Sequence, residues 1–294
     1  MFVSDICIGF PFTHMTQLSR RFLYISHYLV FCLPLLGFFR CSKDQEAKSS
    51  SDRILIPYTV LKVFPHDNKA YTQGLTVFEG RLFESTGQAN SWIAEVDIAS
   101  GNQEKKVILD KKYFGEGITI LNNKVYQLTW QNHVGFIYDV RTFRRLQEFP
   151  YAREGWGITH NGKNLIASDG TEKLYFLDTL TLQPVDTLIV KDSSGKVDNL
   201  NELEFIDDYV YANRWGTSII LKIDPSTGDV LAVLDLSALS EKAHQINPRA
   251  DVLNGIAYEK KSKTLLVTGK LWPALFVLHM QKPDTLLTTG RPLP

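Results

Sequence analysis

The sequence predicts an all-β fold, a five-bladed β-propeller, on three observations. One pattern occurs five times: an opening tripeptide, two short apolar strands joined by a polar turn, and a further strand after a polar stretch. The units recur about every 40 to 50 residues, the period of propeller blades. Helical periodicity is nearly absent. The openings are Gln73-Gly74-Leu75, Glu116-Gly117-Ile118, Trp156-Gly157-Ile158, Glu202-Leu203-Glu204 and Asn254-Gly255-Ile256.

The strands of each unit are predicted from apolar runs that lie between turn residues. Polar pairs, several with strong turn preferences, separate the first two strands. These pairs are Glu79-Gly80, Asn122-Asn123, Asn161-Gly162, Asp207-Asp208 and Lys260-Lys261. A third strand is expected at residues 93–97, 135–139, 174–178, 221–224 and 274–278.

Two predicted elements lie outside the repeats. Residues 54–64 alternate apolar and polar side chains as a strand does, but they precede the first unit. Because a propeller commonly closes its ring by pairing a leading strand with the last blade, we expect residues 54–64 to complete blade five. Residues 237–244 are expected to form a short helical turn between blades four and five.

Residues 1–48 are predicted to be an export segment with a linker, and residues 49–294 the catalytic propeller domain. Arg20 and Arg21 precede an apolar stretch, residues 22–39, that a histidine and a proline interrupt. Such a stretch is too short and too broken for a stable membrane span, and it is typical of a secretory signal. Met1 and Met15 are alternative start sites.

Cys41 directly follows this apolar segment, as the acylated cysteine of a bacterial lipoprotein does. Arg40 departs from the small residue that usually precedes such a cysteine. Acylation of Cys41 and plain secretion therefore both stay open. In either case we expect export to the periplasm or cell envelope, with a lipid anchor as the only membrane attachment.

The charge balance and the cysteines exclude several classes of function. The 32 Lys and Arg residues equal the 32 Asp and Glu residues, so no net field recruits nucleic acid. All three cysteines precede the repeats, and the predicted domain therefore has no disulfide, thiol nucleophile or thiolate metal site. The histidines show no ligand spacing, so no catalytic metal or other cofactor is expected, while a structural ion in the channel stays open.

Residues at the unit openings are predicted to converge at one mouth of the central channel. They are Gln73, Glu116, Trp156, Asn201 with Glu202, and Asn254. A second set lies about 14 residues further on, where the paired strands end, and consists of Trp130, Trp215 and Lys270. Because a hairpin returns to where it starts, both sets are expected at the same rim.

Glu116 is the candidate acid or base of this rim. It lies between Gly115 and Gly117, so a substrate can approach it closely, and partial burial would raise its pKa toward the range useful for proton transfer. The alternative is a structural carboxylate that accepts backbone hydrogen bonds at a strand end. For Trp130, Trp156 and Trp215, the alternative is packing between blades.

These residues give the chain a resemblance to the glutaminyl-peptide cyclotransferases of the plant and bacterial type, which are five-bladed propellers. The resemblance covers residues 58–278. Its motifs are Tyr71-Thr72-Gln73-Gly74-Leu75, Phe114-Gly115-Glu116-Gly117, Leu128-Thr129-Trp130, Glu154-Gly155-Trp156-Gly157, Leu200-Asn201-Glu202-Leu203-Glu204 and Leu253-Asn254-Gly255-Ile256-Ala257.

The resemblance implies a reaction and a set of site residues. The α-amine of an N-terminal glutamine would attack its own γ-carboxamide, and a five-membered lactam would form with release of ammonia. Glu116 would be the general acid and base, and Gln73, Asn201 and Lys270 would bind the amide or stabilise the oxyanion. The implied substrate-binding residues are Tyr71, Gln73, Phe114, Trp130, Trp156, Asn201, Trp215 and Lys270.

In this resemblance, Tyr71 stands where the family can have phenylalanine, and its hydroxyl is expected to tune the pocket without abolishing activity. The implied substrates are peptides or proteins with an N-terminal glutamine, and a monomer is expected. Two other functions stay open. A non-catalytic propeller could bind a peptide or glycan, and a metal-dependent propeller hydrolase would need more inward carboxylates than Glu116 and Glu202.

Overall fold

A computed structural model of the protein describes residues 54–88 and 90–281. The predicted export segment, including Cys41, lies outside these residues. Within the described residues, no helix is long and apolar enough to cross a membrane.

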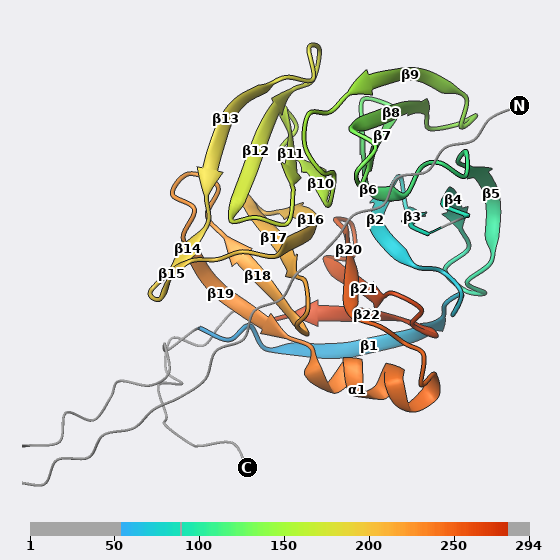
Figure 1. Cartoon of the computed structure of the whole chain (residues 1–294). Helices are drawn as coiled ribbons and strands as arrows, with labels where there is room; N and C mark the ends of the chain where they lie inside the picture. The colour runs from blue at the N-terminus through green and yellow to red at the C-terminus, as the bar shows by residue number, and fades with distance from the viewer. Residues whose placement is uncertain (1–53, 89, 282–294) are drawn as a thin grey trace, which may run out of the picture. The chain divides into compact units, whose positions relative to one another are not determined.

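Five four-stranded antiparallel sheets surround a common centre, and the predicted five-bladed propeller is confirmed (Figure 1). In chain order from the innermost strand outward, blade one contains β2 (Thr72–Phe78), β3 (Arg81–Thr86), β4 (Trp92–Val96) and β5 (Gln103–Ile108). Blade two contains β6 (Gly115–Leu121), β7 (Lys124–Thr129), β8 (Val134–Asp139) and β9 (Arg145–Pro150). Blade three contains β10 (Ile158–His160), β11 (Asn164–Ser168), β12 (Lys173–Asp178) and β13 (Pro184–Ile189).

Blades four and five complete the ring. Blade four contains β16 (Leu200–Ile206), β17 (Tyr209–Arg214), β18 (Ile219–Ile223) and β19 (Val230–Asp235). Blade five contains β20 (Leu253–Glu259), β21 (Thr264–Gly269), β22 (Ala274–Met280) and, as its outermost strand, β1 (Tyr58–Pro65). A small hairpin of β14 (Lys191–Asp192) and β15 (Gly195–Lys196), which the sequence did not predict, connects blades three and four.

The N-terminal strand pairs with the last blade, as expected, but it begins later than predicted. β1 runs antiparallel to β22, with Tyr58 opposite Met280 and Pro65 opposite Ala274. The residues before Tyr58 lie along blade four instead. The N–H of Val233 in β19 donates to the carbonyl of Ile54, and the N–H of Ile56 donates to the carbonyl of Val233.

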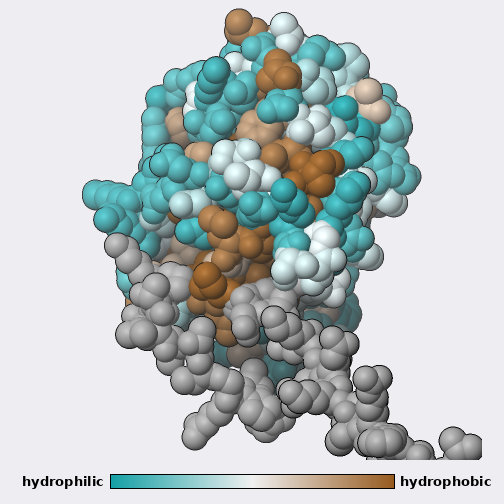
Figure 2. Space-filling model, turned by 90° about the vertical axis from the view of Figure 1, so that its left-hand side faces the viewer, coloured by the Kyte–Doolittle hydropathy of each residue, from teal (hydrophilic) through white to brown (hydrophobic). Residues whose placement is uncertain are grey.

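The outer strands of blades one to four were not predicted separately, and exposure explains this for the first three. β5, β9 and β13 carry many exposed side chains, so they lack the continuous apolar run that marks the inner strands. β19 differs, because residues 230–234 form an apolar run and three of them are buried. Figure 2 shows the left-hand side of the view in Figure 1, where hydrophobic side chains lie scattered among hydrophilic ones. The predicted helical turn is α1 (Ser237–Ile246), two residues longer than expected, which buries Leu239, Ser240 and Ala243.

The hydrophobic core consists of layers between neighbouring blades. One such layer joins Leu121 and Tyr126 of blade two to Ile158 and Leu165 of blade three. Full burial of an aliphatic side chain of this kind contributes about 1.5–3 kcal/mol, so each blade is stabilised mainly by its neighbours. The blades are therefore positioned firmly enough to hold side chains from different blades in one site.

The glycine in the opening motif is required by close contact between inner strands. A Cβ atom on Gly157 would lie 2.0 Å from the carbonyl oxygen of Asn201, and one on Gly74 would lie 2.5 Å from the nitrogen of Ile118. No side chain fits at such distances, and the repeated glycine lets neighbouring blades meet backbone to backbone at the centre.

The opening of blade four begins one residue earlier in the chain than the sequence pattern predicted. A β-bulge interrupts the pairing between Gly115 and Ile118, between Leu200 and Leu203, and between Leu253 and Ile256. Asn201 therefore corresponds to Glu116 and Asn254, and Glu202 takes the place of the glycine. Its Oε1 accepts the N–H of Leu75 over 3.2 Å, and its Oε2 accepts the N–H of Ile256 over 2.7 Å. Glu202 thus links blade four to blades one and five.

Candidate active site

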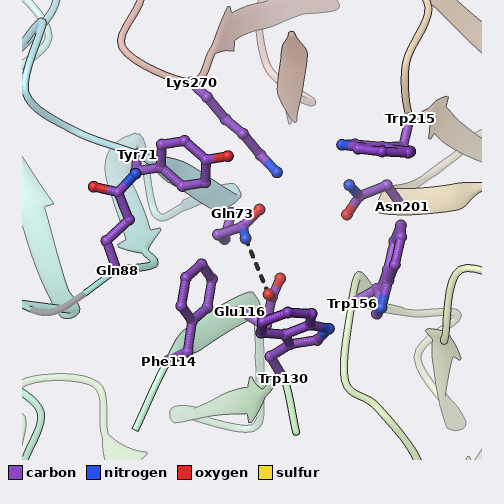
Figure 3. A pocket seen from close by; sticks show the side chains of 10 residues that line it. All are labelled: Tyr71, Gln73, Gln88, Phe114, Glu116, Trp130, Trp156, Asn201, Trp215 and Lys270. Carbon is purple, nitrogen blue, oxygen red and sulfur yellow. Dashed lines mark hydrogen bonds between the residues drawn. The ribbon is translucent and has the colours of Figure 1, made fainter. Parts of the chain in front are cut away.

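A pocket of about 280 Å³ opens at one mouth of the channel (Figure 3). It is lined by the candidate catalytic residue and all the implied substrate-binding residues, whereas Glu202 and Asn254 of the predicted rim do not line it. Gln88 is the additional lining residue that the sequence did not indicate. The lining residues are Tyr71, Gln73, Gln88, Phe114, Glu116, Trp130, Trp156, Asn201, Trp215 and Lys270.

Two structural positions, repeated from blade to blade, direct these side chains to one rim. Gln73, Glu116 and Asn201 lie at the bulges near the start of the inner strands β2, β6 and β16. Trp130, Trp215 and Lys270 are the first residues after β7, β17 and β21, the strands that pair with the inner strands of their blades. Both sets therefore contribute to one pocket, although Glu202 and Asn254 of the first set do not line it.

Glu116 supplies the one carboxyl among the described residues that line the pocket, and 4% of the residue is exposed. Its Oε1 accepts a hydrogen bond from Nε2 of Gln73 over 3.0 Å. Gln73 is itself oriented by Asn254, whose Nδ2 donates to Oε1 of Gln73 over 3.2 Å. The partner of the Glu116 carboxyl is therefore a side-chain amide, which differs from the purely structural alternative of a carboxylate bonded to backbone N–H groups.

Burial shifts Glu116 and Lys270 of the pocket toward their neutral forms. Burial raises the pKa of Glu116 well above its ordinary value, Lys270 opposes this rise, and the charge of Glu154 adds to it. Burial lowers the pKa of Lys270, and the charges of Glu116 and Asp251 oppose this fall. A carboxyl with a raised pKa can both accept and return a proton near neutral pH.

Tyr71 connects Lys270 to the aromatic wall of the pocket. The Lys270 ammonium lies 4.8 Å from the centroid of the Tyr71 ring, which is a cation–π contact. The Tyr71 hydroxyl donates to Oδ2 of Asp251 over 3.2 Å, and burial together with Asp251 raises the pKa of Tyr71 to about 12. The extra hydroxyl of Tyr71 is therefore bonded to a neighbouring side chain.

The aromatic side chains form two walls of the pocket. Phe114 packs edge-on against Tyr71, with ring centroids 6.3 Å apart, and lies 5.6 Å from Trp130. Trp156 and Trp215 meet edge-on at 6.1 Å on the other side. Trp130 and Trp215 are 37% and 46% exposed, so the alternative that they pack between blades is wrong for these two.

The histidines and carboxylates do not converge on a metal site within the described residues. No group of three or more His, Cys, Asp or Glu side chains there is arranged to hold an ion. His66, for example, is buried beside Glu84, with Nε2 3.1 Å from Oε1. The expectations that catalysis needs no cofactor and that the channel could hold a structural ion stay untested.

Gln88 and the carboxylates around the pocket escaped sequence reasoning for identifiable reasons. Gln88 lies in an exposed turn after β3 with a φ of 71°, and a polar residue in a turn has no distinctive pattern. Asp251 acts through one hydrogen bond, accepted from the Tyr71 hydroxyl, that only the fold brings about. Glu154 belongs to a motif that the sequence did indicate, but its bonding pattern depends on blades two and three meeting.

Comparisons with known proteins agree with this arrangement. A sequence model of the family described as Glutamine cyclotransferase matches residues 33–280. A glutaminyl-peptide cyclotransferase of Arabidopsis thaliana is 40% identical over 228 residues, which cover 76% of this chain and 71% of that protein. The crystal structure of Myxococcus xanthus glutaminyl cyclase superimposes with a TM-score of 0.74 at 34% identity, covering 79% of this chain and 100% of that one. The five-bladed ring, the pocket and these matches together show that the chain belongs to the glutamine cyclotransferase family.

Proposed function

We propose that the pocket converts the N-terminal glutamine of peptides and proteins to pyroglutamate and releases ammonia. The observation that carries this function is the buried Glu116 carboxyl, which has an amide donor on one side and faces Lys270 across a small pocket with aromatic walls (Figure 3). A volume of about 280 Å³ lies at the lower end of the range for ligand pockets. It suits a single folded residue better than a large ligand.

The proposed chemistry needs one proton carrier. The substrate's α-amine nitrogen attacks the γ-carboxamide carbon, the new C–N bond closes the lactam, and the bond to the amide nitrogen breaks as ammonia leaves. Glu116 accepts the proton of the attacking amine and delivers it to the departing nitrogen, so no net proton is consumed. Because attack requires the carboxylate form, activity rises with pH as Glu116 loses its proton.

Lys270 and Asn201 are the candidates for contacts with the reacting groups. The Lys270 ammonium can stabilise the negative charge that develops on the amide oxygen, since a cation placed in advance in a dry pocket favours the charged transition state. Oδ1 of Asn201 is buried and has no hydrogen-bond partner among the described residues. Such an acceptor is costly unless it is satisfied, and an N–H of the bound substrate would satisfy it.

Gln73 has a different role from the one first expected. Its Nε2 is bonded to Glu116 and its Oε1 to Asn254. We therefore assign Gln73 to the orientation of Glu116 instead of direct binding of the oxyanion.

The folded-back glutamine side chain would be held in attack geometry, and shielded from water, by Trp130, Trp156 and Trp215. The exposed faces of Trp130 and Trp215 leave room for the rest of the peptide.

Neither alternative function is favoured by a specific observation. A propeller that only binds has no need for a buried carboxyl with an oriented amide donor, because burial of a carboxyl is costly. A metal-dependent hydrolase needs a convergent set of ligands, which the described residues do not form.

The direct test measures ammonia release, together with the corresponding mass loss, when a short peptide with N-terminal glutamine is mixed with the purified protein. Glu116→Gln is expected to lower kcat by about a hundredfold or more, because the proton carrier is lost. Glu148→Gln on the exposed strand β9 is the matched control and should leave the rate unchanged. No turnover by a folded wild-type protein on several such peptides would contradict the function.

We further propose that residues 1–48 direct export to the periplasm or cell envelope, with acylation of Cys41 as the means of attachment. Expression in a bacterium with a labelled fatty acid tests this proposal. The label should appear on the wild-type chain and in the membrane fraction, and Cys41→Ser should abolish both signals. A soluble, unlabelled exported wild-type protein would instead indicate plain secretion.

A further inference from the structure

One carboxylate outside the pocket lining joins two of the pocket tryptophans. Oε2 of Glu154 accepts a hydrogen bond from Nε1 of Trp130 over 2.9 Å and another from Nε1 of Trp156 over 3.1 Å. Its Oε1 accepts a third from Nε2 of Gln131 over 3.0 Å. Trp130 follows β7 of blade two and Trp156 precedes β10 of blade three. A single side chain therefore sets the orientation of indole rings from two blades.

The backbone holds Glu154 in place for these bonds. The N–H of Gly155 donates to the carbonyls of Thr129 and Trp130, over 3.0 and 3.2 Å. A Cβ atom on Gly155 would lie only 2.6 Å from Cβ of Leu128, so the two segments meet closely. The backbone after Glu154 is therefore fixed to blade two, which keeps the Glu154 side chain within reach of Trp130.

The Trp156 ring is confined on its other side as well. A Cβ atom on Gly170 would lie 2.6 Å from Cζ2 of Trp156, which shows that the ring packs directly against that glycine. Trp156 also meets Trp215 edge-on at 6.1 Å. The hydrogen bond to Glu154 is thus the polar contact that fixes the rotation of a ring already held by packing.

The three donors to Glu154 are neutral, so the carboxylate retains its full negative charge. Burial raises the pKa of Glu154, but the hydrogen bonds from Gln131, Trp156 and Trp130 lower it by more, and the group stays ionised. That charge acts on Glu116, whose pKa it helps to raise. Glu154 therefore affects the pocket in two ways, through the indole rings and through its electric field.

We propose that Glu154 is a positioning residue for glutamine cyclisation, because its carboxylate fixes the indoles of Trp130 and Trp156 as the walls that hold the substrate side chain for attack. This inference rests on the proposed function. Small displacements of groups that hold a substrate reduce the rate strongly, since attack geometry is lost while most binding contacts persist. The effect is therefore expected mainly in kcat.

Two substitutions separate the hydrogen bonds from the charge. Glu154→Ala removes both and should lower kcat about ten- to a hundredfold with a smaller change in KM. Glu154→Gln keeps an oxygen that can accept the indole N–H groups, so it should recover most of kcat. Because it removes the negative charge near Glu116, it should also lower the pKa of that carboxyl and move the acid limb of the kcat profile to lower pH. Glu148→Gln on the exposed strand β9 is the control and should leave kcat and KM unchanged.

A cycle with the tryptophans tests whether Glu154 acts through them. In a Trp130→Phe, Trp156→Phe background, neither ring can donate to Glu154. There Glu154→Ala should have almost no further effect on kcat at a pH above the acid limb, where Glu116 is fully ionised. Near-ultraviolet circular dichroism should change in Glu154→Ala, with a melting temperature close to that of the wild type. An unchanged kcat in Glu154→Ala, or a full effect in the Trp130→Phe, Trp156→Phe background, would overturn the inference alone. Absence of wild-type turnover in the same assay would overturn the proposed function and this inference together.

Discussion

Asn254 determines which way the side-chain amide of Gln73 faces. Nδ2 of Asn254 donates to Oε1 of Gln73 over 3.2 Å, so the Gln73 NH₂ group is left to donate to Oε1 of Glu116 over 3.0 Å. A donor to a carboxyl oxygen stabilises its charged form. The pair therefore counteracts part of the pKa rise that burial produces at Glu116.

Substitution of Gln73 should shift the pH dependence of the reaction upward. Gln73→Met has a similar volume but no donor, so the Glu116 carboxylate loses a hydrogen bond and its pKa rises further. The acid limb of the kcat profile should move to higher pH and kcat near neutral pH should fall about tenfold, on the scale of one hydrogen bond to a charged group. Steady-state kinetics across the pH range measure this. An unshifted limb would show that Gln73 does not control the Glu116 proton, and the shift is opposite in sign to that expected for Glu154→Gln.

Lys270 should limit the reaction at alkaline pH. Burial lowers its pKa from 10.5, so the cation that stabilises the oxyanion is lost as the pH rises through this lowered value, and kcat should fall within that range. Lys270→Met should lower kcat about a hundred- to a thousandfold, the usual effect of removing one oxyanion donor. Lys270→Arg should keep some activity and lose the alkaline limb, because a guanidinium stays charged. The exposed Lys163→Met is the control, and an alkaline limb that persists in Lys270→Arg would assign it to another group.

The Tyr71 hydroxyl should contribute to stability more than to catalysis. Tyr71→Phe removes the bond to Asp251 and keeps the ring against Phe114 and beneath Lys270. The free energy of unfolding should fall by about 0.5–1.5 kcal/mol, and kcat/KM should stay within about threefold of the wild-type value. Thermal denaturation and the peptide assay measure the two effects. A loss of activity as large as that of Lys270→Met would mean that the hydroxyl touches the reacting groups.

Glu204, at the opposite mouth of the channel, should make the protein less stable as the pH rises. Burial raises its pKa from 4.5 to about 8, although the N–H of Tyr258 and the charge of Lys260 oppose this. Between these values the folded state holds a proton that the unfolded state has released. The free energy of unfolding therefore decreases from about pH 4.5 to about pH 8, by up to about 1.4 kcal/mol per pKa unit.

Glu204→Gln removes the group that releases this proton. The melting temperature of the variant should therefore fall less between pH 6 and pH 9 than the melting temperature of the wild-type protein. The shifts at Glu116 and Glu202 have the same sign and persist in both proteins, and the difference between the two curves isolates Glu204. Parallel curves would show that Glu204 ionises at its ordinary pKa in the folded protein.

Local pattern and family resemblance predicted the parts of the structure that repeat. The turn pairs and apolar runs located the inner strands, and the shared hairpin geometry placed Trp130, Trp215 and Lys270 beside Glu116. The exposed outer strands were missed because solvent-facing strands carry no strong apolar signal. Blade four was aligned one residue late, because its glutamate replaces the glycine that marks the other openings.

The hydrogen bonds that orient the site could not be predicted in this way. The contacts from Asn254 to Gln73 and from Trp130 to Glu154 each join residues that are distant in the sequence. The orientation of the Gln73 amide and the choice of Glu154 as the shared acceptor depend on distances of a few ångströms between segments that the fold brings together. Strand periodicity contains no information at that scale.

The Glu202 side chain makes the number of blades a fixed property of this chain. Its two oxygens need one donor from blade one and one from blade five, and these donors come within reach only when the ring has its present circumference. Insertion of a copied unit would leave a fully buried carboxyl without partners, at a cost of about 1–3 kcal/mol per lost group or more. Stacked repeat proteins can lengthen by duplicating a unit. Addition of a unit to this ring would instead break the two hydrogen bonds of Glu202.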